Sequence, residues 1–316
     1  MFNTGNTDQE LTNYLMKKMA DAGDDALEKA QRSSRLVARK QMATRKDGKQ
    51  YMTTVWVNPD DIKKEKTAKM RFTDEMHKTE SGKYTQERAK LHREIRDKVI
   101  SQCGKPKEGE RPVAILMGGG SASGKSTMKE GVLDPKLKSE GIQAGTVDSD
   151  KIKESLPEYA GYQKIDINEA ARYVHNESSE IGAHIIDTAV EEGRNFVYDG
   201  TMKSTGKYEQ LINRLKDAGY DVHIYVCDIP TELAIERSDA RAKKSGRKVP
   251  HEIIKASHAG VPKSVEKLKD KVNSFQVFDN SGDELQLIAS NDYVEPEKYT
   301  AFLAKGGVKY RATADS

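Results

Sequence analysis

Short apolar runs alternate with longer amphipathic stretches from Pro112 onward. The runs predict strands over residues 113–117, 144–147, 196–199, 222–228, 276–279 and 286–289. Between them, apolar positions recur at helical spacing, which predicts helices over about residues 125–133, 168–192, 207–218, 231–244, 251–273 and 296–304. Strands that alternate with helices indicate an α/β fold, a parallel sheet flanked by helices. Such a sheet binds its ligands at the carboxyl ends of the strands.

The first 110 residues follow a different pattern, with predicted helices joined by polar turns. Leu91, Ile95, Val99 and Ile100 fall on one face of a helix predicted over residues 85–102. An apolar face of this kind needs a packing partner, so we expect the helix to dock on another part of the protein.

A short strand is also predicted, over residues 51–57. Residues 104–112 are rich in Gly, Pro and charge, which is typical of a linker. The predicted organisation is therefore a charged, mainly helical extension over residues 1–110 and an α/β domain over residues 111–316.

Composition excludes some classes of protein. Charged residues make up 33% of the chain and hydrophobic residues 35%, which is polar but richer in apolar residues than a disordered chain. The apolar runs are much shorter than the roughly 20 residues of a membrane span, and the first residues lack the features of a secretory signal. We expect a cytoplasmic protein without membrane contact. Lys and Arg exceed acidic residues within residues 1–110 but are interleaved with them, as on solvated helices, so nucleic-acid binding is not expected.

The strongest chemical signal follows the first strand of the α/β domain. The segment GGSASGKS fits the P-loop pattern GxxxxGK[ST] and lies between a predicted strand and a predicted helix, as that motif requires. In a P-loop the backbone N–H groups surround the β-phosphate, the lysine reaches the β- and γ-phosphates, and the final hydroxyl binds Mg²⁺. We therefore expect ATP and Mg²⁺ as cofactors. The predicted nucleotide-binding residues are Gly119, Gly120, Ser121, Ala122, Ser123, Gly124, Lys125, Ser126 and Thr127.

Acidic residues follow two of the later strands. Asp148 and Asp150 come after residues 144–147, and Asp199 ends the strand at residues 196–199. A carboxylate at this edge of the sheet can accept the proton of an attacking hydroxyl or hold Mg²⁺, which are the tasks that phosphoryl transfer adds to phosphate binding. Asp150 could instead cap the helix that follows it, but we favour the functional role. Asp148 is expected to point to the other face if the strand continues that far.

Three arginines, Arg237, Arg241 and Arg247, lie in the segment TELAIERSDARAKKSGRKVP. Arginines on a helix pair after the fourth strand can close over the γ-phosphate and stabilise transition-state charge. Arg237 and Arg241 are four residues apart and so share a helical face. A solvated basic helix explains the same pattern equally well.

In order along the chain, these blocks resemble the zeta toxin family, ATP-dependent kinases of bacterial toxin–antitoxin systems that phosphorylate the 3′-hydroxyl of UDP-N-acetylglucosamine. The similarity runs from about Val113 to about Ser290. It rests on GGGSASGKS, VDSDKIK, EEGRNFVYDGT after a long helix, IERSDAR and GRKVP. The resemblance implies a P-loop kinase fold and transfer of the γ-phosphate of ATP to a hydroxyl of a small acceptor.

The resemblance also assigns roles to single residues. Lys125 and Ser126 bind the phosphates and Mg²⁺, and Asp150 is the catalytic base. Arg237 and Arg247 correspond to the two arginines that clamp the triphosphate. All five residues lie at matching positions of the quoted segments.

The residues expected to contact the acceptor match the family less closely than the phosphate-binding residues do. Asp199 and Thr201 fall in the segment that shapes the nucleotide and acceptor sites, and Asp199 stands where some members of the family have glutamate. We assign Asp199 to the metal as well. Glu177 and Glu180 both fit the family's acidic residue on the long helix, and we assign Glu180 to the acceptor.

More than one function remains open at this point. The favoured function is a zeta-toxin-like kinase whose partners are a small acceptor such as a UDP-sugar and an antitoxin or other protein bound through residues 1–110. An antibiotic, a nucleotide or a polynucleotide end would be an alternative acceptor. The alternative outside the enzymes is a nucleotide-dependent binding module. Such a module would not need a base such as Asp150 directed at an acceptor hydroxyl.

Overall fold

The computed structural model describes residues 37–44, 50–58, 63–65, 67–246 and 248–310. The chain divides into two compact units, Met1–Met70 and Arg71–Ser316. In the first unit, β1 (Val37–Thr44) and β2 (Gln50–Val57) form an antiparallel pair. β2 confirms the strand predicted over residues 51–57. Helices predicted before residue 37 lie outside the described residues.

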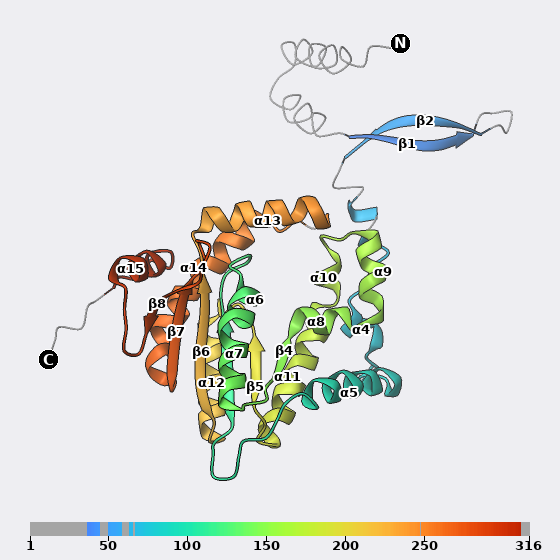
Figure 1. The fold of residues 1–316 in the computed structure, drawn as a ribbon. Coiled ribbons are helices and arrows are strands. Elements are labelled where there is room, and N and C mark those ends of the chain that lie inside the picture. The colour runs from blue at the N-terminus through green and yellow to red at the C-terminus, as the bar shows by residue number, and fades with distance from the viewer. Residues whose placement is uncertain (1–36, 45–49, 59–62, 66, 247, 311–316) are drawn as a thin grey trace. The chain divides into compact units, whose positions relative to one another are not determined.

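A sheet of six strands organises the second unit (Figure 1). The strands lie in the order β4-β5-β3-β6-β7-β8, and all run parallel except the edge strand β8, which is antiparallel to β7. The α/β fold class and every predicted strand are confirmed, whereas the reversed edge strand was not foreseen. The bounds of the strands are β3 (Val113–Gly118), β4 (Gly145–Asp148), β5 (Phe196–Asp199), β6 (Asp221–Asp228), β7 (Ser274–Asp279) and β8 (Gln286–Ser290).

Helices cover the sheet on both faces, which explains why the central strands read as continuous apolar runs. On one face, Ile115 and Met117 of β3 pack in one cluster with Met128, Leu133 and Leu137 of the segments that follow the P-loop. These segments are α6 (Lys125–Met128), the π-helical turn η1 (Lys129–Leu133) and α7 (Asp134–Glu140). Neighbouring residues of β3 point to the opposite face because side chains alternate along a strand.

The remaining helices surround the carboxyl edge of the sheet and its other face (Figure 1). Predicted helices coincide with α6, η1 and α10 to α15. A helix after Asp150 was expected without bounds and is α8, whereas α7 and α9 were not predicted. The bounds are α8 (Ser149–Glu154), α9 (Pro157–Ile165), α10 (Ala170–Tyr173), α11 (His175–Glu191), α12 (Thr205–Asp217), α13 (Thr231–Ser245), α14 (His251–Leu268), η2 (Lys269–Lys271) and α15 (Pro296–Ala304). No described helix is long and apolar enough to cross a membrane.

Residues 71–110 pack with the sheet, although the sequence-based division at residue 110 assigned them to the extension. They contain α4 (Thr73–His77) and α5 (Gln86–Ile100), and α5 contacts both α11 and β4. Ile95 and Ile100, on the apolar face expected to dock, are buried. At the start of the predicted linker, the Gly104 N–H donates to the Gln143 carbonyl and its own carbonyl accepts from Asn195. These contacts explain why the compact unit begins at Arg71.

Candidate active site

The segment between β3 and α6 has the backbone of a phosphate-binding loop. Ala122 (φ 62°) and Gly124 (φ 91°) adopt positive φ, and the Ser123 N–H donates to the Gly120 carbonyl at 3.2 Å. A Cβ atom at Gly120 would lie 2.3 Å from the ring of His258, and one at Gly124 would lie 2.0 Å from a side-chain nitrogen. Only glycine fits at these two positions, so the tight curvature of the loop accounts for them.

The loop leads into a helix end that suits an anion. Gly124 is the N-cap of α6 and provides no side-chain hydrogen bond, so the first N–H groups of the helix have no partner within it. These N–H groups and the helix dipole favour negative charge. Lys125 and Ser126 stand in the first turn, and both line the adjacent pocket. The residues present therefore fit the phosphates of a nucleotide.

The pocket beside this loop has a volume of about 930 Å³. Of the predicted nucleotide-binding residues, those at positions 122–126 line it, whereas Gly119 and Gly120 are buried behind them and Thr127 is exposed on α6 outside the lining. Ser121 is half-buried and bonds to α14 instead.

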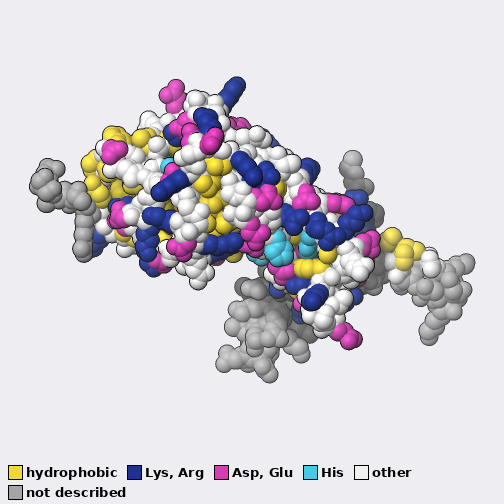
Figure 2. All heavy atoms as spheres, turned by 90° about the horizontal axis from the view of Figure 1, so that it is seen from below, with side chains coloured by type: hydrophobic (Ala, Val, Ile, Leu, Met, Phe, Trp, Pro, Cys, Tyr) yellow, Lys and Arg dark blue, Asp and Glu magenta, His cyan; other side chains and the backbone are white. Residues whose placement is uncertain are grey.

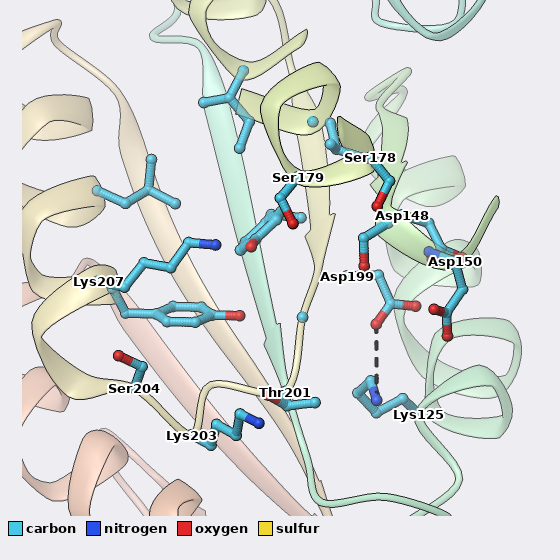
Figure 3. A pocket seen from close by; sticks show the side chains of 18 of the residues that line it. Lys125, Asp148, Asp150, Ser178, Ser179, Asp199, Thr201, Lys203, Ser204 and Lys207 are labelled. Carbon is cyan, nitrogen blue, oxygen red and sulfur yellow. Dashed lines mark hydrogen bonds and ion pairs between the residues drawn. The ribbon is translucent and has the colours of Figure 1, made fainter. Parts of the chain in front are cut away.

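Three carboxylates face Lys125 in this pocket (Figure 3). Asp148 ends β4, Asp199 ends β5, and parallel pairing places these two residues directly opposite each other. The Lys125 ammonium lies 4.0 Å from the Asp199 carboxylate. Burial raises the pKa of Asp199, Asp148 and Asp150 raise it further, and Lys125 opposes them. Asp199 is thus short of positive charge, which suits a site that receives a cation.

Asp148 and Asp150 have different tasks from those that sequence spacing predicts. Asp148 is the N-cap of α8, with its carboxylate accepting from the N–H groups of Asp150 and Lys151. Asp150 is therefore not the cap, and its carboxylate bonds the Lys153 ammonium at 2.7 Å. Asp148 is not turned away either: residues two apart along a strand share a face, and both carboxylates line the pocket.

Metal binding here would need ligands from a substrate. Among the described residues, no group of three or more His, Cys, Asp or Glu side chains is placed to hold a metal ion by itself. Ser126 and Asp199, the predicted metal ligands, line the same pocket. A hydroxyl and a carboxylate that share the ion with phosphate oxygens form the usual magnesium site of this kind of loop.

The opposite wall of the pocket was not predicted from the sequence. It carries Lys203, Ser204 and Lys207, which face the carboxylates across the pocket in Figure 3. Ser178 and Ser179 of α11 also line the pocket, and Ser178 lies beside Asp148 in that view. These residues belong to no motif. The signal for them is the spacing of polar residues on α12, where Lys207 and a second pocket cation, Arg214, are two helical turns apart.

Thr201 lies where the sequence predicts, beside the P-loop. It lines the pocket, and its carbonyl accepts the Gly119 N–H at 3.1 Å. The segment before it is tightly packed, because a Cβ atom at Gly200 would lie 2.0 Å from the Tyr208 hydroxyl oxygen. The glycine of the DGT segment is thus required by a buried tyrosine.

Glu180, assigned to the acceptor, does not line this pocket. Its carboxylate accepts hydrogen bonds from the Lys78 ammonium and the Tyr84 hydroxyl, both at 2.8 Å. Glu177 is fully buried and pairs with Arg88 and His92. Both glutamates point toward residues 71–100, whereas the serines of α11 point into the pocket. The assignment of either one to the acceptor is therefore not supported by this geometry.

The arginines are arranged differently from the prediction. Arg237 donates from its guanidinium to the Asn280 carbonyl at 2.9 Å and does not line the pocket. Arg241, one turn further along α13, does line it. Arg247 lies outside the described residues.

Comparisons with known proteins agree with these features. Over 121 residues the chain is 27% identical to Toxin zeta of Streptococcus pyogenes, in a match that covers 38% of the chain and 41% of the toxin. Over 111 residues it is 30% identical to the Calmodulin calcium-dependent NAD kinase of Arabidopsis thaliana, covering 34% of the chain and 21% of that kinase. The matched regions span less than half the length of these relatives.

Solved structures share the fold at low sequence identity. The crystal structure of AvrRxo1-ORF1:-ORF2 with ATP has a TM-score of 0.57 at 18% identity and covers 78% of this chain and 84% of that chain. A structure from the PezAT chromosomal toxin–antitoxin system of Streptococcus pneumoniae has a TM-score of 0.53 at 18% identity, covering 71% and 95%. The family model described as Zeta toxin matches residues 96–292, which is more than half of the sequence. The chain belongs to the zeta toxin family.

Proposed function

We propose that the protein is an ATP-dependent kinase that transfers the γ-phosphoryl group to a hydroxyl of a small acceptor. One observation carries the proposal: the phosphate-binding loop and the strand-end carboxylates Asp148, Asp150 and Asp199 line a single pocket that is large enough for two substrates. The fold agrees, since a structural neighbour was solved with ATP.

The loop residues would act on the triphosphate. Lys125 is half-buried beside Asp199, and a lysine here offsets the negative charge that shifts between the β- and γ-phosphates during transfer. Ser126 and Asp199 would hold Mg²⁺, which when bound neutralises phosphate charge. Arg241 is the pocket arginine of α13, so it replaces Arg237 as the candidate from this helix for stabilising the transition state, beside Arg247.

Asp150 would orient the acceptor hydroxyl and accept its proton. It lines the pocket, and capping does not occupy its side chain because Asp148 performs that role. The Lys153 ammonium bonds its carboxylate at 2.7 Å and so fixes it at the start of α8. A positioned carboxylate of this kind contributes about 10²–10⁴-fold to a proton transfer.

The acceptor side of the pocket suits a polar, negatively charged molecule. Lys203 and Lys207 supply positive charge there, Arg214 is paired with Asp187 at 2.5 Å, and serines of α11 supply hydroxyl groups. A UDP-activated amino sugar such as UDP-N-acetylglucosamine is the first candidate, through membership of the family. NAD is a second candidate, because one relative is a NAD kinase; its pyrophosphate would suit the same cations.

A protein partner of the antitoxin kind belongs to the same proposal. Support comes from relatives named as toxins and from a structural neighbour that is part of a toxin–antitoxin system. We keep residues 1–70 of the predicted binding region, residues 1–110, as the candidate for this contact, because α4 and α5 pack on α11.

The decisive experiment is to incubate the full chain with γ-labelled ATP, Mg²⁺ and a panel of UDP-sugars, NAD, nucleotides and aminoglycosides, and then to identify the labelled product. Labelling of one small acceptor, lost in Lys125→Met, would support the kinase. Nucleotide binding without labelling of any acceptor would favour the binding module, and labelling of a polynucleotide end would replace the small acceptor.

A further inference from the structure

Two adjacent residues of α14 grip one residue of the phosphate-binding loop. The Ser121 N–H donates to the Ser257 hydroxyl oxygen at 2.9 Å, and the Ser121 carbonyl accepts from the His258 ring nitrogen Nε2 at 3.0 Å. Ser257 and His258 are almost fully buried, at 3% and 1% exposure. Neither side chain lines the pocket. The role of these residues must therefore be exerted through the loop.

These two hydrogen bonds determine the direction in which the N–H groups of the loop point. In a planar trans peptide unit, the carbonyl and the following N–H point in opposite directions. Because His258 holds the Ser121 carbonyl on the α14 side, the N–H of Ala122 must point away from α14. Ala122 lines the pocket, so this N–H is directed toward the space for a phosphate. The preceding peptide is fixed in the same manner, since the Gly120 carbonyl, opposite the gripped N–H, accepts from Ser123.

The gripped conformation is strained at the next residue. Ala122 has φ 62°, in the left-handed region that side chains other than glycine rarely adopt. Rotation of the Ser121–Ala122 peptide plane would relieve this strain and would turn the Ala122 N–H away from the pocket. The two hydrogen bonds from α14 oppose that rotation.

The hydrogen-bonding state of His258 also indicates a role beyond packing. A carbonyl oxygen can only accept, so Nε2 carries the proton and Nδ1 of the neutral ring is the acceptor. Burial lowers the pKa of His258, which favours this neutral form. Nδ1 is buried without a hydrogen-bond partner among the described residues. An apolar side chain would avoid the cost of that unpaired nitrogen, and what it would lack is the donor to Ser121.

We propose that Ser257 and His258 are positioning residues that hold the Ser121–Ala122 peptide in the orientation required for phosphate binding. The inference rests on the proposed function, because it takes Mg-ATP as the ligand of the loop. It also assigns a task to α14, which closes against the loop so tightly that Gly120 admits no side chain beside His258.

The test is binding of Mg-ATP to the full chain, measured by calorimetry, with thermal unfolding recorded on the same samples. In His258→Leu the ring is replaced by an apolar side chain without a donor, and we expect binding to weaken about tenfold while the melting temperature stays equal or rises. His258→Gln places an amide N–H near the position of Nε2 and should bind within about threefold of the wild type. A purely structural residue would lose stability and binding together.

Ala122 provides the second arm of the test. Glycine adopts positive φ without strain, so Ala122→Gly in the His258→Leu background should recover most of the lost affinity. Ser257→Ala, a small deletion that keeps the fold if His258→Leu does not, should weaken binding about threefold. Wild-type affinity in both His258→Leu and Ser257→Ala would overturn the inference and leave the kinase intact. Failure of the wild type itself to bind Mg-ATP would overturn the proposed function, and this inference with it.

Discussion

Two groups of carboxylates in the second unit are neutralised to different extents. In the Arg88 network, the guanidinium of Arg88 bonds both Glu177, at 2.5 and 2.8 Å, and Glu158, at 3.0 and 2.9 Å. His92 and His77 add one bond of 2.6 Å each to these glutamates. Burial alone would raise the pKa of Glu177, but the bonds from Arg88 and His92 outweigh it and lower the pKa to about 2.

Asp199, at the end of β5, shows the opposite balance. Asp199 has Lys125 at 4.0 Å and two further carboxylates nearby, and its pKa is raised by burial and by Asp148 and Asp150. Buried acids that stabilise a fold are surrounded by donors, whereas acids that await a substrate or metal are left short of them. The difference separates the acids that hold α5 on α11 from the acids that define the pocket (Figure 3).

The largest expected effect is that of removing Lys125, the P-loop cation 4.0 Å from Asp199. In Lys125→Met, phosphoryl transfer should fall at least 10³-fold, because the lysine that offsets the charge between the β- and γ-phosphates is then missing. Circular dichroism should show an intact fold, because Lys125 is not part of the core. Labelled ATP with the identified acceptor measures the loss, and an unchanged rate would disprove the role of the loop.

Breaking the Arg88 network should affect stability instead. Arg88→Ala leaves Glu177 buried without its main partner, so we expect the free energy of unfolding to fall by about 3–5 kcal/mol. Urea unfolding at pH 7 measures this change. Arg88→Lys is the matched control. It keeps the positive charge but cannot bond both carboxylates as the planar guanidinium does, so the free energy of unfolding should fall by less than in Arg88→Ala.

The fall in the free energy of unfolding in Arg88→Ala should depend on pH in a definite direction. The folded-state pKa of Glu177, about 2, lies below its ordinary value of 4.5, so the stabilisation is complete above about pH 5 and is lost as the pH falls toward 2. The gap between wild type and Arg88→Ala should therefore shrink at pH 3. An equal gap at pH 7 and pH 3 would show that packing, rather than charge pairing, is what Arg88 contributes.

The next effect concerns Asp150, the proposed catalytic base. Asp150→Asn keeps the shape of the side chain but removes its ability to accept a proton, so acceptor phosphorylation should fall about 10²-fold while ATP affinity stays within a few-fold. Asp148→Asn is the control, because asparagine also caps helices well and should cost less than about tenfold. A larger loss at Asp148 than at Asp150 would assign the base to the other carboxylate.

Features encoded locally in the sequence could be predicted. The P-loop pattern, the central strands and the carboxylates at the strand ends depend on neighbouring residues, and the structure has each of them in place. The helix cap was less predictable: Asp148 and Asp150 are both of a residue type that caps helices, and only the start of α8 at Ser149 decides that Asp148 is the cap.

Features that depend on distant partners could not be predicted. Glu177 and Glu180 share a face of α11, but which face looks into the pocket is set by Arg88, whose position in the chain is 89 residues away from Glu177. The docking of α5 was expected only as an apolar stripe without a partner. Arg237 was likewise predicted to clamp the triphosphate, but its guanidinium donates to the Asn280 carbonyl in the loop after β7. That acceptor is distant in the sequence and could not be foreseen.

The smallest expected effect tests the contrast between Asp199 and the Arg88 network most directly. Removing the charge of one carboxylate should change the free energy of unfolding with opposite signs in the two places. The raised pKa of Asp199 means that the folded state binds its proton more tightly than the unfolded state does, so the ionised side chain destabilises the fold at neutral pH. Asp199→Asn removes this charge and should raise the free energy of unfolding by about 1 kcal/mol at pH 7 in the absence of Mg²⁺.

Glu158→Gln is the counterpart in the Arg88 network. The pKa of Glu158 is lowered because the bonds from Arg88 and His77 outweigh its burial, so this variant should lose stability. Urea unfolding of both variants at pH 7 and pH 3 measures the contrast, which should narrow in acid as the carboxylates gain protons in the unfolded state. A loss of stability in Asp199→Asn as large as that in Glu158→Gln would mean that Lys125 neutralises Asp199 as fully as Arg88 neutralises Glu158, and the distinction between structural and functional carboxylates would fail.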